Sequence, residues 1–388
     1  MNRDVLLISF SAFFADLGYQ AIHALFPIFL VITLSTPASA FGLANAIAYG
    51  IGSFFGYLGG IVSDRYSDKK VAVLGNLFIP LMSLTGLTVS PTVAIALFAG
   101  GWWARNFRTP PRRSLLVGST TEQNRGRVFG FLHALDIGGG MFSVAMLLLL
   151  VAAGVAFRSI LLLTVIPLAI STLLLLPAKD IRRNGKKAKP EPVRSKKGRI
   201  NRSTFRGILL STALFGFSYY SLGFPILTIA QKSTNLLGIA SYGVYLGVSA
   251  ITGYWIGSKR LNYVKGLSIL GYSLSGIGTA ILALGYLYSS SVAILYVGVA
   301  ILGFALGVIE TFEPTIVSFV KGVRELGKGM GALTASRSIG IFMGNLIMGV
   351  LYVLSPFYSY SYAAIISVAA GMIMYRMGSG FNAIGNKR

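Results

Sequence analysis

The sequence predicts an all-α membrane protein with twelve transmembrane helices, and three observations support this prediction. First, 54% of the 388 residues are hydrophobic and only 12% are charged, about half the charged fraction of a typical soluble domain. Second, apolar stretches near the roughly 20 residues that span a bilayer recur along the whole chain. Third, the basic residues gather in alternate loops. A transmembrane β-barrel would show short alternating segments instead.

The N-terminal half contains six apolar stretches that are long enough to be membrane helices. A short uncharged loop with Pro37 separates the first two, and Ser90 and Pro91 form a turn before the fourth. The predicted helices cover about residues 5–34, 40–63, 71–89, 93–117, 128–153 and 159–176.

A basic segment separates this half from a second set of six helices. Residues 179–206 are rich in Lys and Arg and contain Pro190 and Pro192, which predicts a mobile cytoplasmic linker. The expected domains are therefore an N-terminal six-helix bundle over 1–178, the linker over 179–206 and a C-terminal bundle over 207–388 that ends in a short basic tail. The second set covers about residues 207–230, 239–257, 264–288, 292–320, 330–354 and 357–377, with a loop at 322–328.

The net charge of +23 is distributed as the positive-inside rule requires. One side of the predicted bundle carries almost all basic residues, and the other has little beyond Arg158 and Lys232. This distribution places both termini in the cytoplasm and argues against nucleic-acid binding. The expected partners of the basic loops are anionic lipid head groups. The chain contains no cysteine, which excludes disulfides, thiolate chemistry and cysteine metal sites.

The N-terminal stretch predicts a retained helix in the cell membrane. The apolar run over 5–34 is too long for the hydrophobic region of a cleavable signal. We expect a multi-pass, monomeric protein that needs no metal and no cofactor.

A short charged loop joins the second and third predicted helices. The apolar run before it ends abruptly at Asp64, and another begins at Val71. Glycines near the end of the first run allow helix backbones to approach closely. The residues that form a recognisable pattern here are Gly60, Asp64, Arg65, Lys69 and Lys70.

This loop resembles the loop 2–3 signature of the major facilitator superfamily, roughly G-x-x-x-D-R-x-G-R-R/K. Ser67 replaces the usual glycine, and Asp68 replaces a usual basic residue. The resemblance implies a conformational gate that anchors the cytoplasmic end of helix 2 against helix 11 and stabilises the outward-facing state. The alternative interpretation is an ordinary positive-inside hairpin.

The fourth and fifth predicted helices carry a second resemblance. Residues 104–112 read A-R-N-F-R-T-P-P-R, and residues 125–136 read R-G-R-V-F-G-F-L-H-A-L-D. Both are similar to a prokaryotic group of the superfamily that resembles drug and metabolite antiporters. Arg113 stands where that group has an aspartate, and His133 where it has an arginine. Arg105 resembles the helix 4 arginine implicated in proton coupling, but the proline-glycine signature of drug antiporters on helix 5 is absent.

The two halves resemble each other at three places. Residues 61–65 match 256–260, residues 26–28 match 224–226, and residues 126–130 match 327–331, at offsets of 195 to 201. Two such halves, with the substrate bound between them near the midplane, form the architecture of this superfamily.

Charged residues inside the N-terminal helices are the candidates for proton coupling. A charge at the bilayer centre costs about 2.5–3.5 kcal/mol and usually faces a cavity or another charge. Asp16, Gln20 and His23 share one face of the first helix, and His133 and Asp136 form a second carboxylate–histidine pair. Buried carboxylates and histidines can exchange protons near neutral pH. In the alternative interpretation, each carboxylate only pairs with a buried arginine.

Other polar and aromatic residues are candidates for a substrate cavity. Arginines on the fourth helix and carboxylates on the tenth would suit a polar or charged solute, although a salt-bridge network that controls opening is an equally good interpretation. The cavity candidates are Gln20, Arg105, Arg108, Tyr219, Tyr220, Glu310, Glu313 and Arg337.

These features predict a secondary transporter rather than an enzyme. We expect alternating access for a small polar or charged solute or a drug, driven by a proton gradient through Asp16 or Asp136. One alternative is an uncoupled facilitator in which the buried charges are gating salt bridges, and another is a lipid-translocating member of the same fold. The sequence contains no metal-ligand pair of histidines and no G-x-S-x-G motif, so an enzyme is not expected.

Overall fold

The computed structural model describes residues 2–120, 124–180, 202–218, 222–257 and 262–378. All regular structure in these residues is helical, and eleven of the helical segments are long and apolar enough to cross a membrane. Each of the eleven corresponds to one predicted helix. The fourth predicted helix is present as α5, Pro91–Gly118, but its arginines make it too polar to count among the eleven.

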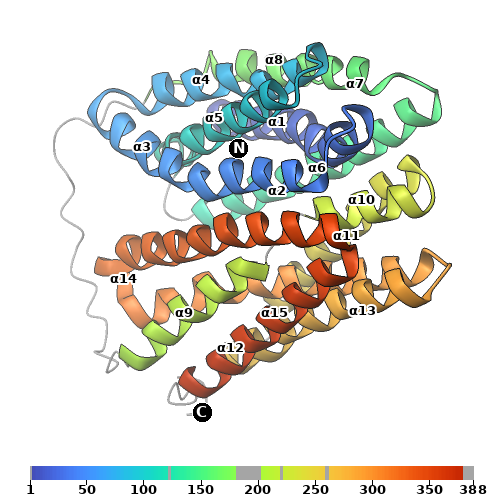
Figure 1. The fold of residues 1–388 in the computed structure, drawn as a ribbon. Helices are drawn as coiled ribbons and strands as arrows, with labels where there is room; N and C mark the ends of the chain where they lie inside the picture. Colours follow the sequence, from blue (N-terminus) through green and yellow to red (C-terminus); the bar gives the residue numbers. More distant parts are fainter. Residues whose placement is uncertain (1, 121–123, 181–201, 219–221, 258–261, 379–388) are drawn as a thin grey trace. The chain divides into compact units, whose positions relative to one another are not determined.

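The chain divides into two compact units, and the first contains Met1–Lys189 together with Thr234–Gly243. In this unit α1 packs against α6 and α8, while α5 packs against α3 and α4. Figure 1 follows the elements by colour from the N-terminus. They are α1 (Arg3–Ile28), η1 (Phe29–Thr33), α2 (Ala38–Asn45), η2 (Ala46–Gly50), α3 (Ile51–Arg65), α4 (Asp68–Phe78), η3 (Ile79–Leu87), α5, α6 (Arg125–Ala152), α7 (Phe157–Leu163) and α8 (Val165–Leu175).

The second unit contains Pro190–Ser233 and Val244–Arg388. Here α9 packs against α14 and α15, and α13 packs against the same two helices. The elements are α9 (Arg202–Ser218), α10 (Gly223–Lys232), α11 (Asn235–Gly257), α12 (Tyr263–Gly266), η5 (Leu267–Ser273), α13 (Leu274–Tyr288), α14 (Ala293–Leu354) and α15 (Pro356–Gly378). Helix α11 begins in the first unit and ends in the second.

The helix α14 corrects one prediction. Residues 322–328 were expected to form a loop, but the helical assignment runs through them, from Ala293 to Leu354. No proline occurs in 322–328 to remove a backbone donor. Arg337 nevertheless bonds to Glu313, 24 residues earlier, which a straight helix would place about 36 Å away. The chain therefore turns back between the two spans of α14, 293–317 and 331–354.

Two glycines allow the helices of the first unit to approach closely. Pro111 has no N–H for the carbonyl of Phe107, four residues earlier on α5. A side chain at Gly59 of α3 would collide with this carbonyl. A side chain at Gly139 of α6 would likewise meet the backbone of Phe13 and the Cβ of Asp16, 3.0 Å away. Helices α3 and α6 can therefore lie directly against α5 and α1 at the level of the buried charges.

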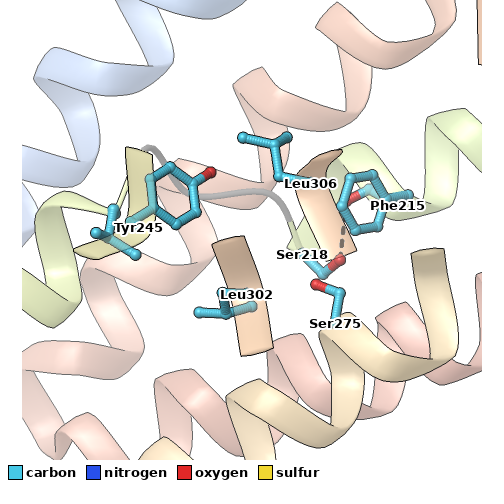
Figure 2. A pocket seen from close by; sticks show the side chains of 7 residues that line it. Phe215, Ser218, Tyr245, Ser275, Leu302 and Leu306 are labelled. Carbon is cyan, nitrogen blue, oxygen red and sulfur yellow. Dashed lines mark hydrogen bonds between the residues drawn. The ribbon is translucent and has the colours of Figure 1, made fainter. Parts of the chain in front are cut away.

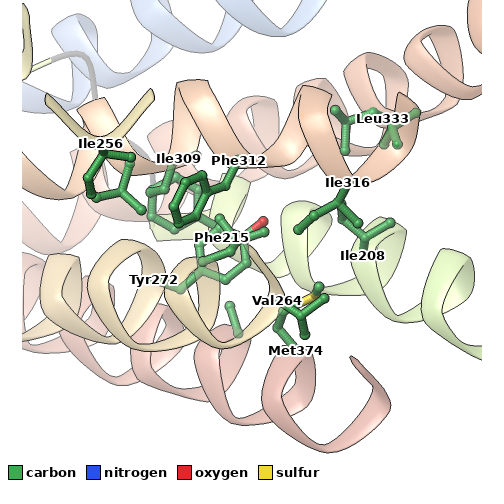
Figure 3. Close-up of a cluster of buried hydrophobic side chains, with 14 residues drawn as sticks. Ile208, Phe215, Ile256, Val264, Tyr272, Ile309, Phe312, Ile316, Leu333 and Met374 are labelled. Atoms are coloured by element: carbon green, nitrogen blue, oxygen red, sulfur yellow. The ribbon is translucent and has the colours of Figure 1, made fainter. Parts of the chain in front are cut away.

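The second unit has a compact apolar core that surrounds its buried carboxylate. Figure 3 shows the side chains of Phe215, Tyr272, Ile309 and Phe312 gathered together. All four are buried, and they come from α9, η5 and α14. Tyr272 of this core donates a hydrogen bond to the carboxylate of Glu313 on α14, which is fully buried.

Candidate functional site

Asp16 is the centre of a hydrogen-bonded chain in the first unit. It lies about 20 Å along α1 from Arg3, at 1.5 Å per residue, and it is only 5% exposed. The hydroxyl of Tyr19, one turn further along α1, donates to its carboxylate. That hydroxyl in turn accepts a long hydrogen bond of 3.4 Å from Nη2 of Arg105 on α5. A buried carboxylate and a guanidinium thus act on each other through one phenol.

Arg105 lies against aromatic rings and lacks strong hydrogen bonds. Its guanidinium carbon is 4.9 Å from the ring centre of Trp102 and 5.2 Å from that of Tyr19, which are distances for cation–π attraction. Its Nη1 donates to Oδ1 of Asn106 at 3.3 Å. Its buried Nε has no hydrogen-bond partner among the described residues. This guanidinium keeps donor capacity for another group.

Asp136 on α6 forms its ion pair with Arg112 on α5. The nearest nitrogen and oxygen are 3.7 Å apart, which is an ion pair but too long for a hydrogen bond. Arg112 is 5% exposed. Within the part of the chain that the structure describes, its Nε and Nη1 and the Oδ1 of Asp136 have no hydrogen-bond partner.

The two carboxylates and the arginines form one electrostatic cluster. Asp136, Arg105 and Arg112 all lie close enough to Asp16 to act on its charge. Arg105 and Arg112 are seven residues apart on α5, so they lie on the same face, two turns apart. Asp136 forms its ion pair with Arg112, and His133 is exposed on α6. The expected pairing of His133 with Asp136 and its role in proton coupling stay predictions.

Aromatic residues surround Gln20 and His23, which lie one and two turns beyond Asp16 on α1. The ring of His23 is 8% exposed, hydrogen-bonds to the hydroxyl of Tyr49 and lies 5.7 Å from the ring of Trp102. Tyr242, which clusters with the first unit, stacks on His23 at 5.4 Å and donates to Oε1 of Gln20 at 2.6 Å.

Arg108 occupies a different environment from the other two arginines. Its side chain is 1% exposed, and its Nη1 donates to Oδ1 of Asn76 on α4 at 2.8 Å. Nδ2 of Asn76 donates to Ser171 and Thr172 on α8 at 3.0 and 3.1 Å. This network connects α4, α5 and α8, which favours a packing role for Arg108 over its predicted place in a cavity.

The second unit brings three predicted residues together on α14. Arg337 bonds through Nη1 to Glu310 at 2.6 Å and through Nη2 to Glu313. The side chain of Glu310 is 54% exposed, whereas that of Glu313 is fully buried. Glu313 also accepts hydrogen bonds from Thr212 on α9, at 2.9 Å, and from Tyr272 on η5. Tyr219 and Tyr220 lie outside the described residues.

The second unit also has a small cavity, drawn in Figure 2. Its volume of about 20 Å³ is lined by apolar side chains and by Ser218, Tyr245 and Ser275. That volume holds about one water molecule. It is too small for a transported solute.

The predicted gate motif lies at the junction of α3 and α4. Asp64 and Arg65 are exposed at the end of α3, and Lys69 is in the first turn of α4. Gly60 lies one turn earlier on α3, next to Pro110 of α5. Ser67 caps α4 by accepting from the N–H of Lys70 at 3.0 Å, and its hydroxyl donates to Asp180 at 2.7 Å. The expected partner of the motif, helix 11, lies in the second unit, so the gate stays a prediction.

Sequence reasoning missed the neutral partners in this site. Tyr19, Trp102, Tyr49 and Asn76 each contact a predicted residue from another position or helix. Tyr19 could have been found from its spacing, because it lies three residues after Asp16 on the same helix face. The other three depend on which helices pack together.

The apolar spans define a multi-pass membrane protein with charged residues buried inside its helices. The profile of the Major Facilitator Superfamily matches residues 8–262, well over half of the chain. The protein therefore belongs to this superfamily, and it is a membrane transporter.

One curated relative and several solved structures are similar over almost the whole length. The uncharacterized MFS-type transporter MJ1317 of Methanocaldococcus jannaschii is 24% identical and covers 96% of this chain and 94% of its own. A POT family transporter in complex with a thioalcohol-conjugated peptide aligns with a TM-score of 0.77 at 12% identity, covering 97% and 96% of the two chains. A mutant of the nucleoside transporter NupG gives 0.75 at 13% identity, covering 98% and 100%. The xylose transporter XylE of E. coli gives 0.72 at 14%, covering 96% and 95%. These structures share the fold.

Proposed function

We propose that this protein is a secondary active transporter that moves a small polar or charged solute or drug across the cell membrane by alternating access, coupled to protons. The observation that carries the proposal is Asp16, a buried carboxylate in the middle of α1 that is connected to Arg105 through Tyr19. Intramembrane carboxylates of this kind form proton relays in transporters. The proton gradient supplies the energy, and no cofactor or metal is required.

The charge balance of the cluster suggests how a proton changes the conformation. Asp16 and Asp136 hold α1 and α6 against the arginines of α5 by electrostatic attraction. Protonation removes one negative charge and weakens that attraction in a low-dielectric environment. The three helices can then separate, and deprotonation restores the first arrangement.

The proposal includes twelve spans with both termini in the cytoplasm. Helix α5 is the twelfth span, since its 28 residues reach about 42 Å. Arg158 and Lys232 are the main basic residues of the opposite side, and both donate to backbone carbonyls at or near the end of another helix. Arg158 bonds to Thr88 at 2.7 Å, and Lys232 bonds to Tyr286 at 2.6 Å. Their donors are satisfied within the protein, while the cytoplasmic basic loops can bind anionic lipid head groups.

We also propose that the chain forms two six-helix halves, 1–178 and 207–388, joined by a basic linker over 179–206. The proposed transporter is a monomer. No catalytic role is assigned to any residue, and we propose that the protein is not an enzyme.

A second candidate function is an uncoupled facilitator, and the second unit favours it. Glu313 is fully buried and accepts from Arg337, Tyr272 and Thr212. A buried carboxylate with these three partners suits a gating salt bridge, because charge-assisted hydrogen bonds hold it in one place. A lipid-translocating function would require a large apolar cavity in the C-terminal half, and the cavity beside Ser218 and Ser275 has a volume of only about 20 Å³.

Proteoliposomes with a pH-sensitive dye inside test the proposal. Pools of organic anions, cations, sugars and drugs are added to vesicles that contain wild type or Asp16→Asn. We expect solute-dependent proton movement in wild type and none in Asp16→Asn. Asp68→Asn, the same chemical change in the first turn of α4, is the matched control and should behave as wild type. Solute movement without proton movement in wild type would favour the facilitator.

A further inference from the structure

The arginines of α5 have more donor capacity than the described residues use. A guanidinium carries five N–H donors. Arg112 is 5% exposed, its ion pair with Asp136 spans 3.7 Å, and its Nε and Nη1 have no hydrogen-bond partner in the described part of the chain. Arg105 makes only two long bonds, and its Nε is also without a partner there. Buried donors in this state are expensive, which indicates that another group satisfies them during the functional cycle.

The charge of the cluster indicates the sign of that group. Two guanidinium groups (Arg105 and Arg112) act on two carboxylates (Asp16 and Asp136) on α1, α5 and α6. The cluster is therefore balanced when both carboxylates are ionised, and it has one excess positive charge when one of them is protonated. An anion would restore the balance, whereas a cationic solute would increase the imbalance.

The hydrogen-bonding geometry of arginine narrows the chemistry further. A guanidinium presents parallel N–H groups that match two oxygens of a carboxylate or phosphate. Nε and Nη2 of Arg112 form such an edge: Nε has no hydrogen-bond partner among the described residues, and Nη2 makes the 3.7 Å ion pair with Asp136. Arg105, two turns away on the same face, lies on the rings of Trp102 and Tyr19, so a second contact point and an apolar wall are available.

We propose that Arg112, together with Arg105, is the subsite that binds an oxyanion group, a carboxylate or a phosphate, of the transported solute. This inference rests on the proposed transport function and names its substrate class. The oxyanion replaces Asp136 as the partner of Arg112, so the neighbouring carboxylates of Asp16 and Asp136 lose a balancing positive charge, and Asp16 takes up the coupled proton. Solute and proton therefore bind together, which makes the transporter a symporter.

The proton step involves Asp16 and the groups that act on its charge among the described residues. These are Arg105 and Arg112 on α5, Asp136 on α6 and the phenol of Tyr19 on its own helix. A proton on Asp16 removes one negative charge beside the two arginines. Anion affinity should therefore rise as the pH falls.

Binding can be measured without transport through the fluorescence of Trp102, which contacts Arg105. The chain has three tryptophans, so a Trp103→Phe, Trp255→Phe background leaves Trp102 as the only tryptophan. The purified protein is titrated at constant ionic strength with acetate, butyrate and benzoate in one arm, and with inorganic phosphate and glycerol phosphate in the other. Chloride is the control for ionic strength. The two arms distinguish a carboxylate from a phosphate substrate.

We expect a saturable change in one arm that is roughly ten- to hundred-fold weaker in Arg112→Gln, because a charged, two-point hydrogen bond is lost. Arg112→Lys keeps the charge but not the paired donors and should weaken binding less. Arg113→Gln removes the same charge from the exposed neighbour on α5 and should bind as the background does. For the ionised carboxylates, affinity should be higher at pH 6 than at pH 8.

Arg112→Gln leaves Asp136 unpaired and can unfold the protein, so Arg112→Gln with Asp136→Asn provides a charge-balanced second variant. It should remain folded and fail to bind. The proposal is overturned if neither arm gives saturable binding, or if Arg112→Gln and Arg113→Gln weaken it equally. Anion binding without proton movement would remove the coupling and keep this subsite. Proton movement driven only by neutral or cationic solutes would overturn the anion subsite and keep the proton coupling.

Discussion

At the scale of single residues, the phenol of Tyr19 is the connection on which the proposed coupling depends. It donates to Asp16 and accepts from Arg105, so it stabilises the carboxylate and transmits its charge state to α5. An isolated carboxylate at this depth would lack this donor, and a buried polar group without its partner costs about 1–3 kcal/mol.

Tyr19→Phe should therefore slow proton-coupled transport by about ten-fold or more, since a loss of ~1.4 kcal/mol corresponds to a factor of ten in rate. The measurement is the initial rate of solute-driven proton movement in proteoliposomes. Tyr66→Phe makes the same change at a side chain that is 79% exposed and should have no effect. An unchanged rate in Tyr19→Phe would show that Asp16 acts without this phenol.

Glu310 and Glu313, the two carboxylates that pair with Arg337, should differ in their contribution to stability. Glu313→Gln breaks the ion pair of a fully buried carboxylate and should lower the free energy of unfolding by about 3–5 kcal/mol. Glu310→Gln removes the exposed partner and should cost only about 0–1 kcal/mol. Denaturant unfolding of the purified protein in detergent compares the two variants, and equal losses would contradict the difference in burial.

At this scale the sequence predicts charged residues better than their partners. Asp16, Gln20 and His23 were expected on one face of a helix, and each contacts the same group of aromatic residues. Charges stand out because they are expensive in a membrane. Trp102 and Asn76 do not stand out, because aromatic and amide residues are common in packed helices and only the tertiary contacts reveal them.

At the scale of helices, the close contact of α1 with α6 sets the position of the cluster. Gly139 lies against Phe13 and Asp16 of α1, so Asp136, one turn earlier on α6, lies close to the same region. The helical spans themselves follow from apolar periodicity and length. The failed prediction at 322–328 has a different origin: a charged segment between two spans was interpreted as a loop, whereas the chain turns back there with its residues in helical conformation.

Gly139→Ala should push α6 away from α1 and cost about 1–3 kcal/mol of stability through overpacking, with a loss of coupled transport. Gly130→Ala is the control on the same helix, because nothing lies within 4 Å of the added methyl group; it should be neutral or stabilise the helix by up to ~1 kcal/mol. Thermal unfolding and transport assays measure both variants. Equal stability and equal transport rates in the two variants would contradict the close contact of α6 with α1 at Gly139.

At the scale of the whole molecule, the chain is a multi-pass transporter whose charge distribution predicts its orientation. Composition and span length are sufficient to predict this class, because each helix must satisfy its own backbone in lipid. They do not define the substrate, which depends on a few side chains from different helices.

The orientation can be tested with single cysteines, since the natural chain has none. Tyr66→Cys, in the loop after α3, should react with a membrane-impermeant maleimide only after the cells are permeabilised. Ala153→Cys, exposed at the end of α6, should react in intact cells. The reverse pattern would place the termini outside the cytoplasm.

The central claim is that Asp16 couples solute movement to protons, and one comparison tests it most directly. Proteoliposomes with wild type or Asp16→Asn are assayed for accumulation driven by a pH gradient and for solute counterflow without a gradient. We predict that Asp16→Asn abolishes accumulation and retains counterflow, because the variant still changes conformation but no longer carries the proton. Accumulation at the wild-type level in Asp16→Asn, and also in the double variant with Asp136→Asn, would contradict the account.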